Sequence, residues 1–479
     1  MSESSEPLYA SVAADLAGLI VSGQLQPRTR VPSVRRLAQQ RGISITTAVA
    51  SLRILEQQGL IEARPKSGYF VATRRALPPE PVAVELPRTA RLVGAQALLK
   101  RMSEASLNPV VARLGQAIPD PALFPQAALR ASLARAARRQ PALLATYPLR
   151  MGGSPRLREQ IGAHYGRIGA RLAADDIVVT NGCMEALALA VSAVARPGET
   201  IAVESPTYFG FLQVAENLGV KVLEIPSNPR EGISLEALAE LLAGRAGRSV
   251  RACMVIANYS NPTGSVMPDA RKRALVKLCR EADIALIEDD IYGDLPLAGP
   301  RPLPCKAFDT DGRVLLCSSF SKTLAPGARI GFIESGRYRD QLRAVKFMLS
   351  GATSVLPQEM LADYLASGRY ERHLRCLRQR CAVQIAQVSQ HVQDAFPEGT
   401  RLSRPQGGFV LWVELPGEAD TQALYDIANR SGVDFVPGAM FSASGRYGNC
   451  LRLNCGYPVT AATETAIRRL GEFVRRLAP

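Results

Sequence analysis

Five short motifs of this 479-residue chain could carry chemistry, because each places polar side chains directly after an apolar stretch typical of a buried strand. In chain order they are Asn181-Gly182-Cys183-Met184, Ser205-Pro206-Thr207-Tyr208, Asn261-Pro262-Thr263-Gly264, Glu288-Asp289-Asp290-Ile291-Tyr292 and Ser319-Phe320-Ser321-Lys322. The amine of Lys322 can form a Schiff base with a carbonyl compound. Backbone N–H groups around Gly182 would bind an anion if a helix begins there.

Each motif also has a simpler explanation when it is taken alone. Asn-Pro-Thr-Gly is a good turn, and Tyr208 could be a packed aromatic residue. Asp289 and Asp290 could cap a following helix, and Lys322 could be a surface lysine. It is the order and spacing of the whole set that favour one functional site.

The elements that must position these motifs alternate between strands and helices. Strands are expected over residues 177–180, 200–203, 221–225, 253–257, 285–287 and 314–318, with helices over 186–194 and 209–218. This alternation predicts a mostly parallel α/β sheet covered on both faces. Ligands of such sheets bind beyond the carboxyl ends of the strands, where the five motifs lie.

In this order and spacing the motifs resemble those of pyridoxal 5'-phosphate (PLP) aminotransferases of the aspartate aminotransferase fold, fold type I. The resemblance covers about residues 109–479 and implies PLP as cofactor. It implies that Lys322 holds PLP as an internal aldimine and that Asp289 pairs with the pyridine nitrogen. Asn261 and Tyr292 would bind the phenolic oxygen, and Tyr208 would stack on the ring.

The same resemblance implies a set of donors for the cofactor phosphate: Gly182, Cys183, Met184, Ser319, Ser321 and Arg329. The family often has Ser-Gln where Cys183-Met184 stand. The substitution removes a hydroxyl and an amide, so we expect weaker phosphate binding. The backbone N–H groups are unaffected by it, so we expect binding to persist.

Two further positions follow from the resemblance. Tyr147 matches a tyrosine that reaches the phosphate of the neighbouring subunit, which implies a homodimer with shared sites. Arg452 matches the arginine that grips the α-carboxylate of an amino acid substrate. A structural ion pair is the alternative role for Arg452.

Positive charge is concentrated near the N-terminus. The chain carries a net charge of +15, and residues 16–75 hold ten Lys and Arg against two acids. Such a concentrated basic region is typical of a nucleic-acid-binding domain, although a solvated surface without a partner would carry the same charge.

The pattern of this region predicts a winged helix-turn-helix. Helices are expected over 8–21, between Ser33 and Gly42, and between Ser44 and Gly59, followed by strands over 61–64 and 69–71. Residues 8–72 closely resemble the GntR-type DNA-binding domain, through Val31-Pro32-Ser33-x-Arg35-x-Leu37-Ala38, Leu55-x-x-x-Gly59-Leu60-Ile61 and Ser67-Gly68-Tyr69-Phe70-Val71.

This resemblance implies a set of DNA-contacting residues: Arg35, Ser44, Thr46, Thr47, Lys66 and Gly68. Arg35 could instead form a salt bridge within the domain, and the two threonines could simply cap the helix. The family often has Arg where Ile45 stands and Pro-Gly where Pro27-Arg28 stands. These departures affect the expected base preference rather than DNA binding.

The two resemblances divide the chain into three regions. They are a DNA-binding domain over 1–75, a proline-containing linker over 76–108, in which a short helix could span 93–102, and an aminotransferase-like domain over 109–479. The last has a large part at about 140–340 and a small part at about 341–479 that includes an arm over 109–139. This layout resembles MocR-type regulators within the GntR family.

Three functions are consistent with this layout. The first is a transcriptional regulator that senses PLP, an amino acid or an amine through the aminotransferase-like domain. The second is an active aminotransferase with an attached DNA-binding domain. The third is a regulator whose PLP site is vestigial, which the complete set of site residues disfavours. The operator and the effector are not specified by the sequence.

Composition excludes several other classes. No apolar stretch is long enough to span a bilayer, and the first residues carry acids where a signal peptide carries positive charge, so we expect a cytoplasmic protein with no membrane partner. The nine cysteines are odd in number and scattered, which argues against a disulfide framework. The pairs Cys376/Cys381 and Cys450/Cys455 lack the spacing of a zinc knuckle, so no metal is expected.

Overall fold

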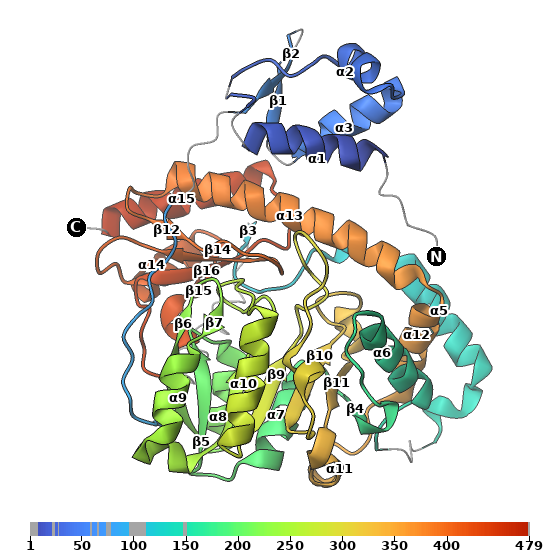
Figure 1. Ribbon diagram of the computed structural model, residues 1–479, viewed down its shortest axis with the longest axis vertical. Helices are drawn as coiled ribbons and strands as arrows, with labels where there is room; N and C mark the ends of the chain where they lie inside the picture. The colour runs from blue at the N-terminus through green and yellow to red at the C-terminus, as the bar shows by residue number, and fades with distance from the viewer. Residues whose placement is uncertain are drawn as a thin grey trace.

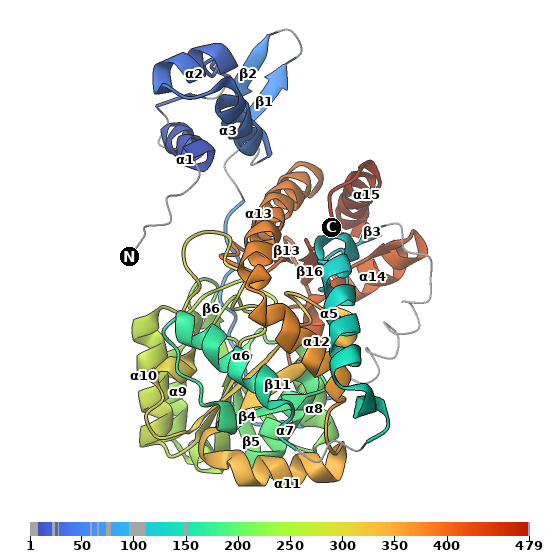
Figure 2. The same ribbon diagram turned by 90° about the vertical axis from the view of Figure 1, so that its right-hand side faces the viewer.

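The computed structural model describes residues 8–21, 24–26, 28–57, 60–64, 67–72, 78–94, 112–146 and 151–477. A small N-terminal unit stands above a larger body in Figures 1 and 2, beside the long helix α13 (Arg369–Ala395). Within the described residues, no helix combines the length and apolar character that crossing a bilayer requires.

The N-terminal unit is a winged helix-turn-helix, as expected. It contains α1 (Leu8–Val21), α2 (Val34–Arg41), α3 (Ile45–Gln57) and the antiparallel pair β1 (Ile61–Arg64) and β2 (Gly68–Val71). Ser33 begins α2 by accepting a hydrogen bond from the backbone N–H of Arg36, and Gly42 ends it in a left-handed conformation. The buried stripes of the three helices meet at Leu16, Leu37 and Leu52.

The larger body is built on a mixed, mostly parallel sheet, which confirms the predicted fold class. In spatial order its eight described strands are β4 (Ile177–Thr180), β11 (Gly331–Glu334), β10 (Val314–Ser319), β9 (Ala285–Asp289), β8 (Val250–Val255), β5 (Thr200–Ser205), β6 (Lys221–Asn228) and β7 (Gly232–Ile233). The pairs from β10 through β6 are parallel, whereas β11 and β7 run antiparallel to their neighbours. The carboxyl ends of the parallel strands therefore point to one edge.

Helices cover both faces of this sheet. They are α6 (Pro155–Arg167), α7 (Cys183–Val194), α8 (Phe209–Asn217), α9 (Leu235–Ala243), α10 (Asp269–Glu281) and α11 (Arg339–Leu349). Alternate residues of β5 enter different cores, because Ile201 and Val203 pack with α7 and α8 while Ala202 packs with α9 and α10. Because both faces of these strands are buried, successive residues are all apolar, and the strands appear in the sequence as continuous apolar runs.

A smaller part closes one end of the body. It has the sheet β12 (Arg401–Leu402), β13 (Val410–Glu414), β16 (Cys450–Asn454) and β15 (Val436–Pro437), with helices α14 (Thr421–Arg430) and α15 (Ala461–Leu477). Strand β14 (Val433–Asp434) pairs with β3 (Ala112–Arg113), which precedes the large sheet in the chain. Helix α5 (Gln126–Arg139) packs along α12 (Val355–Ala366) in Figure 2.

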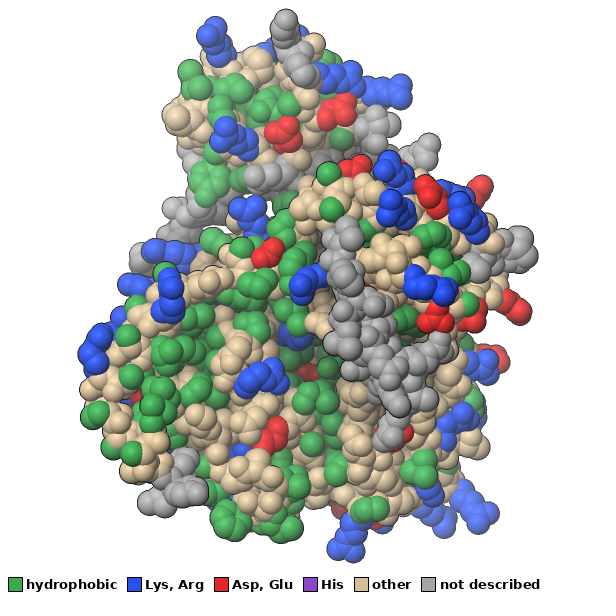
Figure 3. Space-filling model, turned by 180° about the vertical axis from the view of Figure 1, so that it is seen from behind, with side chains coloured by type: hydrophobic (Ala, Val, Ile, Leu, Met, Phe, Trp, Pro, Cys, Tyr) green, Lys and Arg blue, Asp and Glu red, His purple; other side chains and the backbone are tan. Residues whose placement is uncertain are grey.

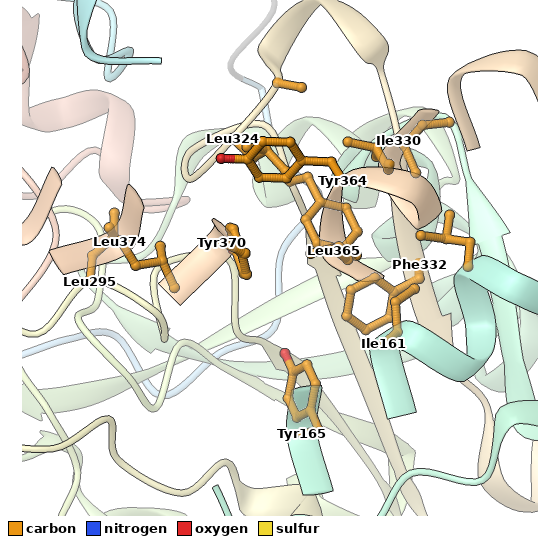
Figure 4. Close-up of a cluster of buried hydrophobic side chains, with 14 of the residues drawn as sticks. Ile161, Tyr165, Leu295, Leu324, Ile330, Phe332, Tyr364, Leu365, Tyr370 and Leu374 are labelled. Carbon is orange, nitrogen blue, oxygen red and sulfur yellow. The ribbon is translucent and has the colours of Figure 1, made fainter. Parts of the chain in front are cut away.

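A buried hydrophobic cluster anchors the loop that follows β10. In Figure 4, Ile161 of α6 lies beside Phe332 of β11, and Leu374 of α13 lies beside Leu295; all four belong to this cluster. Phe320 and Leu324, two residues to either side of Lys322, are buried in the same cluster. The backbone that carries the lysine is thus fixed by packing on both sides.

Residues 78–94, which we call the strap, run along the larger body without regular structure. The strap first contacts the smaller part: the N–H of Leu402 donates to the carbonyl of Pro79 (2.9 Å), and the N–H of Val82 donates to the Glu414 carboxylate (3.1 Å). An extended segment was expected from the prolines of this region.

The strap then contacts the large sheet. Arg91 and Val222 of β6 exchange two backbone hydrogen bonds of 3.0 and 2.8 Å, so the strap covers part of that strand's free edge. Between these attachments, the Glu80 carboxylate lies 2.7 Å from Arg230 of the large part and 3.9 Å from Arg404 of the smaller part. The helix expected over 93–102 lies mostly outside the described residues.

Candidate functional site

The start of α7 forms an anion-binding cradle. The helix begins at Cys183 rather than at Ala186 as expected, and Gly182 precedes it with a φ of +82°. A Cβ atom at Gly182 would lie only 2.7 Å from a guanidinium nitrogen of Arg329, so the glycine lets the arginine approach the helix end. Free N–H groups and a cation therefore face the same place.

Hydroxyl groups extend this cradle from the end of β10. Ser319 and Ser321 are both buried, the Ser319 hydroxyl accepts a hydrogen bond from the N–H of Ser321 (3.2 Å), and Arg329 lies 3.5 Å from the Ser321 hydroxyl. The Met184 side chain packs on the core of the large part, so that residue offers the cradle its backbone N–H. The donor set suits a phosphate group.

Asp289 ends β9 and lies next to this cradle. Its carboxylate is buried, accepts a hydrogen bond from the N–H of Ile291 (3.0 Å) and lies 3.6 Å from the Cys183 thiol. Burial raises the pKa of Asp289 to about 6, and the charge of Asp290 acts in the same direction. A buried carboxylate of this kind would be stabilised by a positively charged N–H of a ligand.

Lys322 follows β10 and is partly buried. Its amine donates a hydrogen bond to the carbonyl of Ala117 (2.6 Å). The pKa of Lys322 is lowered to about 8, first by desolvation and also by the charges of Arg452 and Arg329, while the charge of Asp289 opposes them. A larger share of the amine is therefore neutral and nucleophilic near neutral pH than in an exposed lysine.

Aromatic and amide groups lie near Arg452. Tyr208 precedes α8, and a Cβ at Gly210 would lie 2.5 Å from its ring, so the glycine is needed for this ring position. Desolvation raises the pKa of Tyr208 to about 12, and burial also raises that of Tyr292. Both hydroxyls therefore stay protonated and can donate hydrogen bonds. Asn261 is buried.

Arg452 of β16 is the most deeply buried cation of this group, with 1% of its surface exposed. One guanidinium nitrogen donates to the Asn261 side chain (3.4 Å) and another to the carbonyl of Gly115, while Nε has no partner among the described residues. Burial lowers the pKa of Arg452. Within the described part of the chain no carboxylate forms an ion pair with this arginine, so its charge is available to an anionic ligand.

Comparison with known proteins places this arrangement in a family. Residues 123–470 match the aminotransferase class I and II family, and residues 8–71 match bacterial regulatory proteins of the gntR family. The uncharacterized HTH-type transcriptional regulator YjiR of Escherichia coli is 39% identical over 98% of this chain and 99% of its own length. The probable rhizopine catabolism regulatory protein MocR of Rhizobium meliloti is 28% identical, over 90% of this chain and 86% of its own. The chain is a MocR-type regulator of the GntR family.

Solved aminotransferases share the fold of the regulator's larger body. Kynurenine aminotransferase of Pyrococcus horikoshii, in complex with PMP, has a TM-score of 0.74 and 28% identity, covering 80% of this chain and 95% of that chain. The α-aminoadipate aminotransferase LysN of Thermus thermophilus, complexed with N-(5'-phosphopyridoxyl)-L-leucine, has a TM-score of 0.71 and 26% identity, covering 79% and 94%.

The family implies PLP, and the residues of the regulator fit this cofactor. The cradle at Gly182 and Arg329 suits its phosphate. The raised pKa of Asp289 suits a pyridinium partner, and the lowered pKa of Lys322 suits an aldehyde. The larger body of the regulator is therefore of the PLP-dependent type.

Several predicted residues of this site come from separate stretches of chain and lie in contact in the fold. Cys183 lies 3.6 Å from Asp289, although 106 positions separate them in the sequence. Tyr147 lies outside the described residues, so its role stays a prediction. Among the described residues there is no cluster of three or more metal-ligating side chains.

Sequence reasoning missed several groups that contact the site. The carbonyls of Gly115 and Ala117 accept hydrogen bonds from Arg452 and Lys322, and main-chain acceptors have no side-chain signature. The hydroxyls of Tyr370 and Thr323 lie 2.9 Å apart, which ties the start of α13 to the residue after the lysine. The sequence feature that could have indicated an irregular segment here is Gly115, followed four residues later by Pro119.

The candidate DNA-binding surface lies on α2, α3 and the β1–β2 wing. Ser44 caps α3 by accepting from the N–H of Thr47 (3.1 Å), and its hydroxyl lies 2.7 Å from that of Thr46. Arg35 is exposed and forms no ion pair with any residue that the structure describes. Gly68 has a φ of +94° at the start of β2, while Lys66 lies outside the described residues.

Proposed function

We propose that this regulator binds PLP through Lys322 and changes its affinity for operator DNA when PLP, an amino acid or an amine occupies the site. The observation that carries this proposal is the convergence of three unlike groups. Lys322 has a pKa lowered to about 8, Asp289 has a pKa raised to about 6, and Arg452 is buried with Nε unpaired. Structural ion pairs would perturb pKa values too, but these groups are not paired with one another.

The proposed roles follow from the donors and acceptors present. The Lys322 amine would hold the aldehyde carbon, and Asp289 would keep the ring nitrogen protonated. Asn261 and Tyr292 would orient the ring oxygen, and Tyr208 would cover the ring face. When bound, PLP supplies an electron-withdrawing ring that the protein itself lacks.

The proposed phosphate site joins backbone and side-chain donors. They are the N–H groups of Gly182, Cys183 and Met184, the hydroxyls of Ser319 and Ser321, and Arg329. These groups fix one end of the ligand, and Arg452 offers a charge to a carboxylate at the other end. This arrangement would select small anionic ligands over neutral ones.

The proposed DNA contacts lie at the exposed ends of α2 and α3. Ser44, Thr46 and Thr47 occupy the first turn of α3, the helix that enters the major groove in this domain type. Arg35 would contact a phosphate or a base edge, and the wing with Lys66 and Gly68 would contact the backbone. Because chromosomal DNA lies in the cytoplasm, we place the regulator there.

We propose that the regulator is a homodimer. A run of large apolar side chains at the end of α11 is exposed, with Phe347 at 66%, Met348 at 83% and Leu349 at 63%, and Leu144 is exposed at 81%. Figure 3 also shows hydrophobic side chains over much of one face of the larger body, with a few Lys and Arg among them and more around its outline. Surfaces of this kind are normally covered by a partner, and Tyr147 would reach the second copy's phosphate site.

A gel shift with DNA from upstream of the regulator's own gene tests the proposal. We expect a specific shift that changes when PLP, or PLP with an amino acid, is added. The Lys322→Ala variant should shift the DNA without responding to PLP. Specific DNA binding that ignores both ligands would contradict the sensing role.

A working aminotransferase is the second candidate, because such a reaction would use the same Lys322, Asp289 and Arg452. Incubation of the PLP-loaded protein with amino acids and a 2-oxo acid would test it, with product formation per protein molecule as the measurement. More than one product per site would establish turnover, whereas a single product would leave the site a sensor.

A further inference from the structure

Residues Leu114–Ile118, which we call the carbonyl lid, contact both cations of the site through main-chain oxygens. The carbonyl of Gly115 accepts a hydrogen bond from Nη2 of Arg452, and the carbonyl of Ala117 accepts one from Nζ of Lys322 at 2.6 Å. These are the groups proposed above to bind a carboxylate and an aldehyde. The lid therefore occupies the binding groups of the ligand.

The lid is attached to the smaller part by specific hydrogen bonds. The Asn454 side chain donates to the carbonyls of Arg113 (3.2 Å) and Ile118 (3.1 Å), and its backbone N–H donates to the carbonyl of Leu114 (2.6 Å). The N–H of Leu114 donates to the Asp434 carboxylate (2.7 Å). Both ends of the lid are thus held, and β16 carries both Asn454 and Arg452.

A carbonyl is a poor partner for a buried guanidinium. It carries no charge, so the desolvation that lowers the pKa of Arg452 is offset only in part, by groups such as Asp434, and Nε has no partner among the described residues. A carboxylate brings a full negative charge and two oxygens, so it can form two parallel hydrogen bonds with the guanidinium. Both edges with which a guanidinium grips a carboxylate include Nη2, the atom that Gly115 holds.

We propose that an α-amino acid binds this regulator by displacing the Gly115 carbonyl from Arg452, so that the lid responds to ligands with a carboxylate and not to the corresponding amines. This inference rests on the proposed PLP site. PLP at Lys322 would release the Ala117 carbonyl alone, whereas an amino acid would release Gly115 as well. The two ligands thus leave the lid in different states.

A first experiment compares matched ligands on the PLP-loaded full chain. The probes are L-alanine with ethylamine, L-phenylalanine with 2-phenylethylamine, and L-lysine with 1,5-diaminopentane. Hydrogen–deuterium exchange should rise within residues 112–120 for the amino acids of at least one pair and not for the amines. Equal responses within every pair, or no response to any amino acid, would overturn the proposal.

A second experiment loosens the lid without changing charge. Asn454→Ala removes the side-chain hydrogen bonds to Ile118 of the lid and to Arg113 just before it, so amino acid binding should tighten by roughly three- to tenfold, as expected for lost competing bonds. Amine binding should stay unchanged. Asn449→Ala is the matched control, because its amide donates to the carbonyl of Leu415 in the same sheet region (3.0 Å).

A further variant, Gly115→Ala, tests the lid if Asn454→Ala does not fold. A Cβ at Gly115 would lie 2.5 Å from the Asp434 carboxylate, so Gly115→Ala should move the lid away from Arg452 and also tighten amino acid binding. Weaker or unchanged amino acid binding in every variant that folds would overturn the proposed role of the lid. If the unmutated protein showed no absorption band of lysine-bound PLP, the proposed function itself would be contradicted. Failure of the lid proposal and failure of the proposed function are therefore distinguishable.

Discussion

The two candidate binding regions of this regulator place their functional side chains in opposite environments. In the larger body, Asp289 and Arg452 are buried and Lys322 is partly buried, and desolvation shifts the pKa of all three. In the winged helix-turn-helix, Arg35 and Thr46 are exposed to solvent. One region prepares a few groups for a small ligand, and the other presents a surface to a large one.

The difference predicts different sensitivities. Interactions among buried charges are weakly screened by salt, whereas contacts between exposed cations and DNA phosphates weaken steeply as salt rises. Ligand binding at Lys322 should therefore tolerate salt better than operator binding does. A shared strong salt dependence would show that this comparison is wrong.

The largest effect is expected for Lys322→Ala. The variant should lose the visible absorption of lysine-bound PLP completely, because no other amine of the site can replace Lys322. Circular dichroism should show an unchanged fold, since the loop is anchored by Phe320 and Leu324. Lys277→Ala, at an exposed lysine, should keep the band. Retention of the band in Lys322→Ala would contradict the assignment.

A second large effect is expected for Arg452→Lys. The change keeps the positive charge but loses the planar fork, so amino acid affinity should fall by roughly tenfold to a hundredfold. Titration of the PLP-loaded protein, followed by absorption, measures it. Amines provide the internal control, and an equal loss for amines would mean that the arginine acts through the fold of the site.

Arg35→Ala tests the exposed region. Operator binding should weaken by about 1–3 kcal/mol if Arg35 reads a base, or lose about one unit of salt slope if it contacts a phosphate. Fluorescence anisotropy at several salt concentrations separates these cases. Arg248→Ala, at an exposed arginine of the larger body, is the control. Unchanged binding at low salt would remove Arg35 from the interface.

The smallest effect concerns pH. Only the neutral amine of Lys322 attacks an aldehyde, and its pKa is lowered to about 8. The rate of PLP incorporation should therefore rise about fivefold from pH 7 to pH 8 and level off above pH 9. Stopped-flow absorption measures this rate. A rise that continues to pH 10 would indicate a lysine with an ordinary pKa.

Local structure was largely predictable from the sequence, because it depends on patterns within a few residues. The strand over 177–180 and the cap at Ser33 follow from apolar runs and a short hydroxyl side chain. The start of α7 was predicted three residues late, at Ala186 instead of Cys183. The prediction followed the apolar run that begins at Ala186, whereas the helix begins directly after Gly182.

Contacts between distant parts of the chain were predictable only through the resemblance. The hydrogen bond between Gly115 and Arg452 spans 337 positions and uses a main-chain oxygen, so no residue type marks it. The prolines before residue 90 indicated an extended linker, but not its pairing with Val222. Such contacts depend on how the sheet and the smaller part pack together.

The strap has a consequence for how the two domains could be separated by experiment or exchanged during evolution. A fragment that begins at residue 109 would leave the N–H and C=O of Val222 without their partner at Arg91. An uncovered edge strand invites pairing with another molecule, so such a fragment should self-associate. A fragment that begins at Pro78 would keep the edge covered, which makes residues 73–77 the natural junction for joining a different DNA-binding domain to this body.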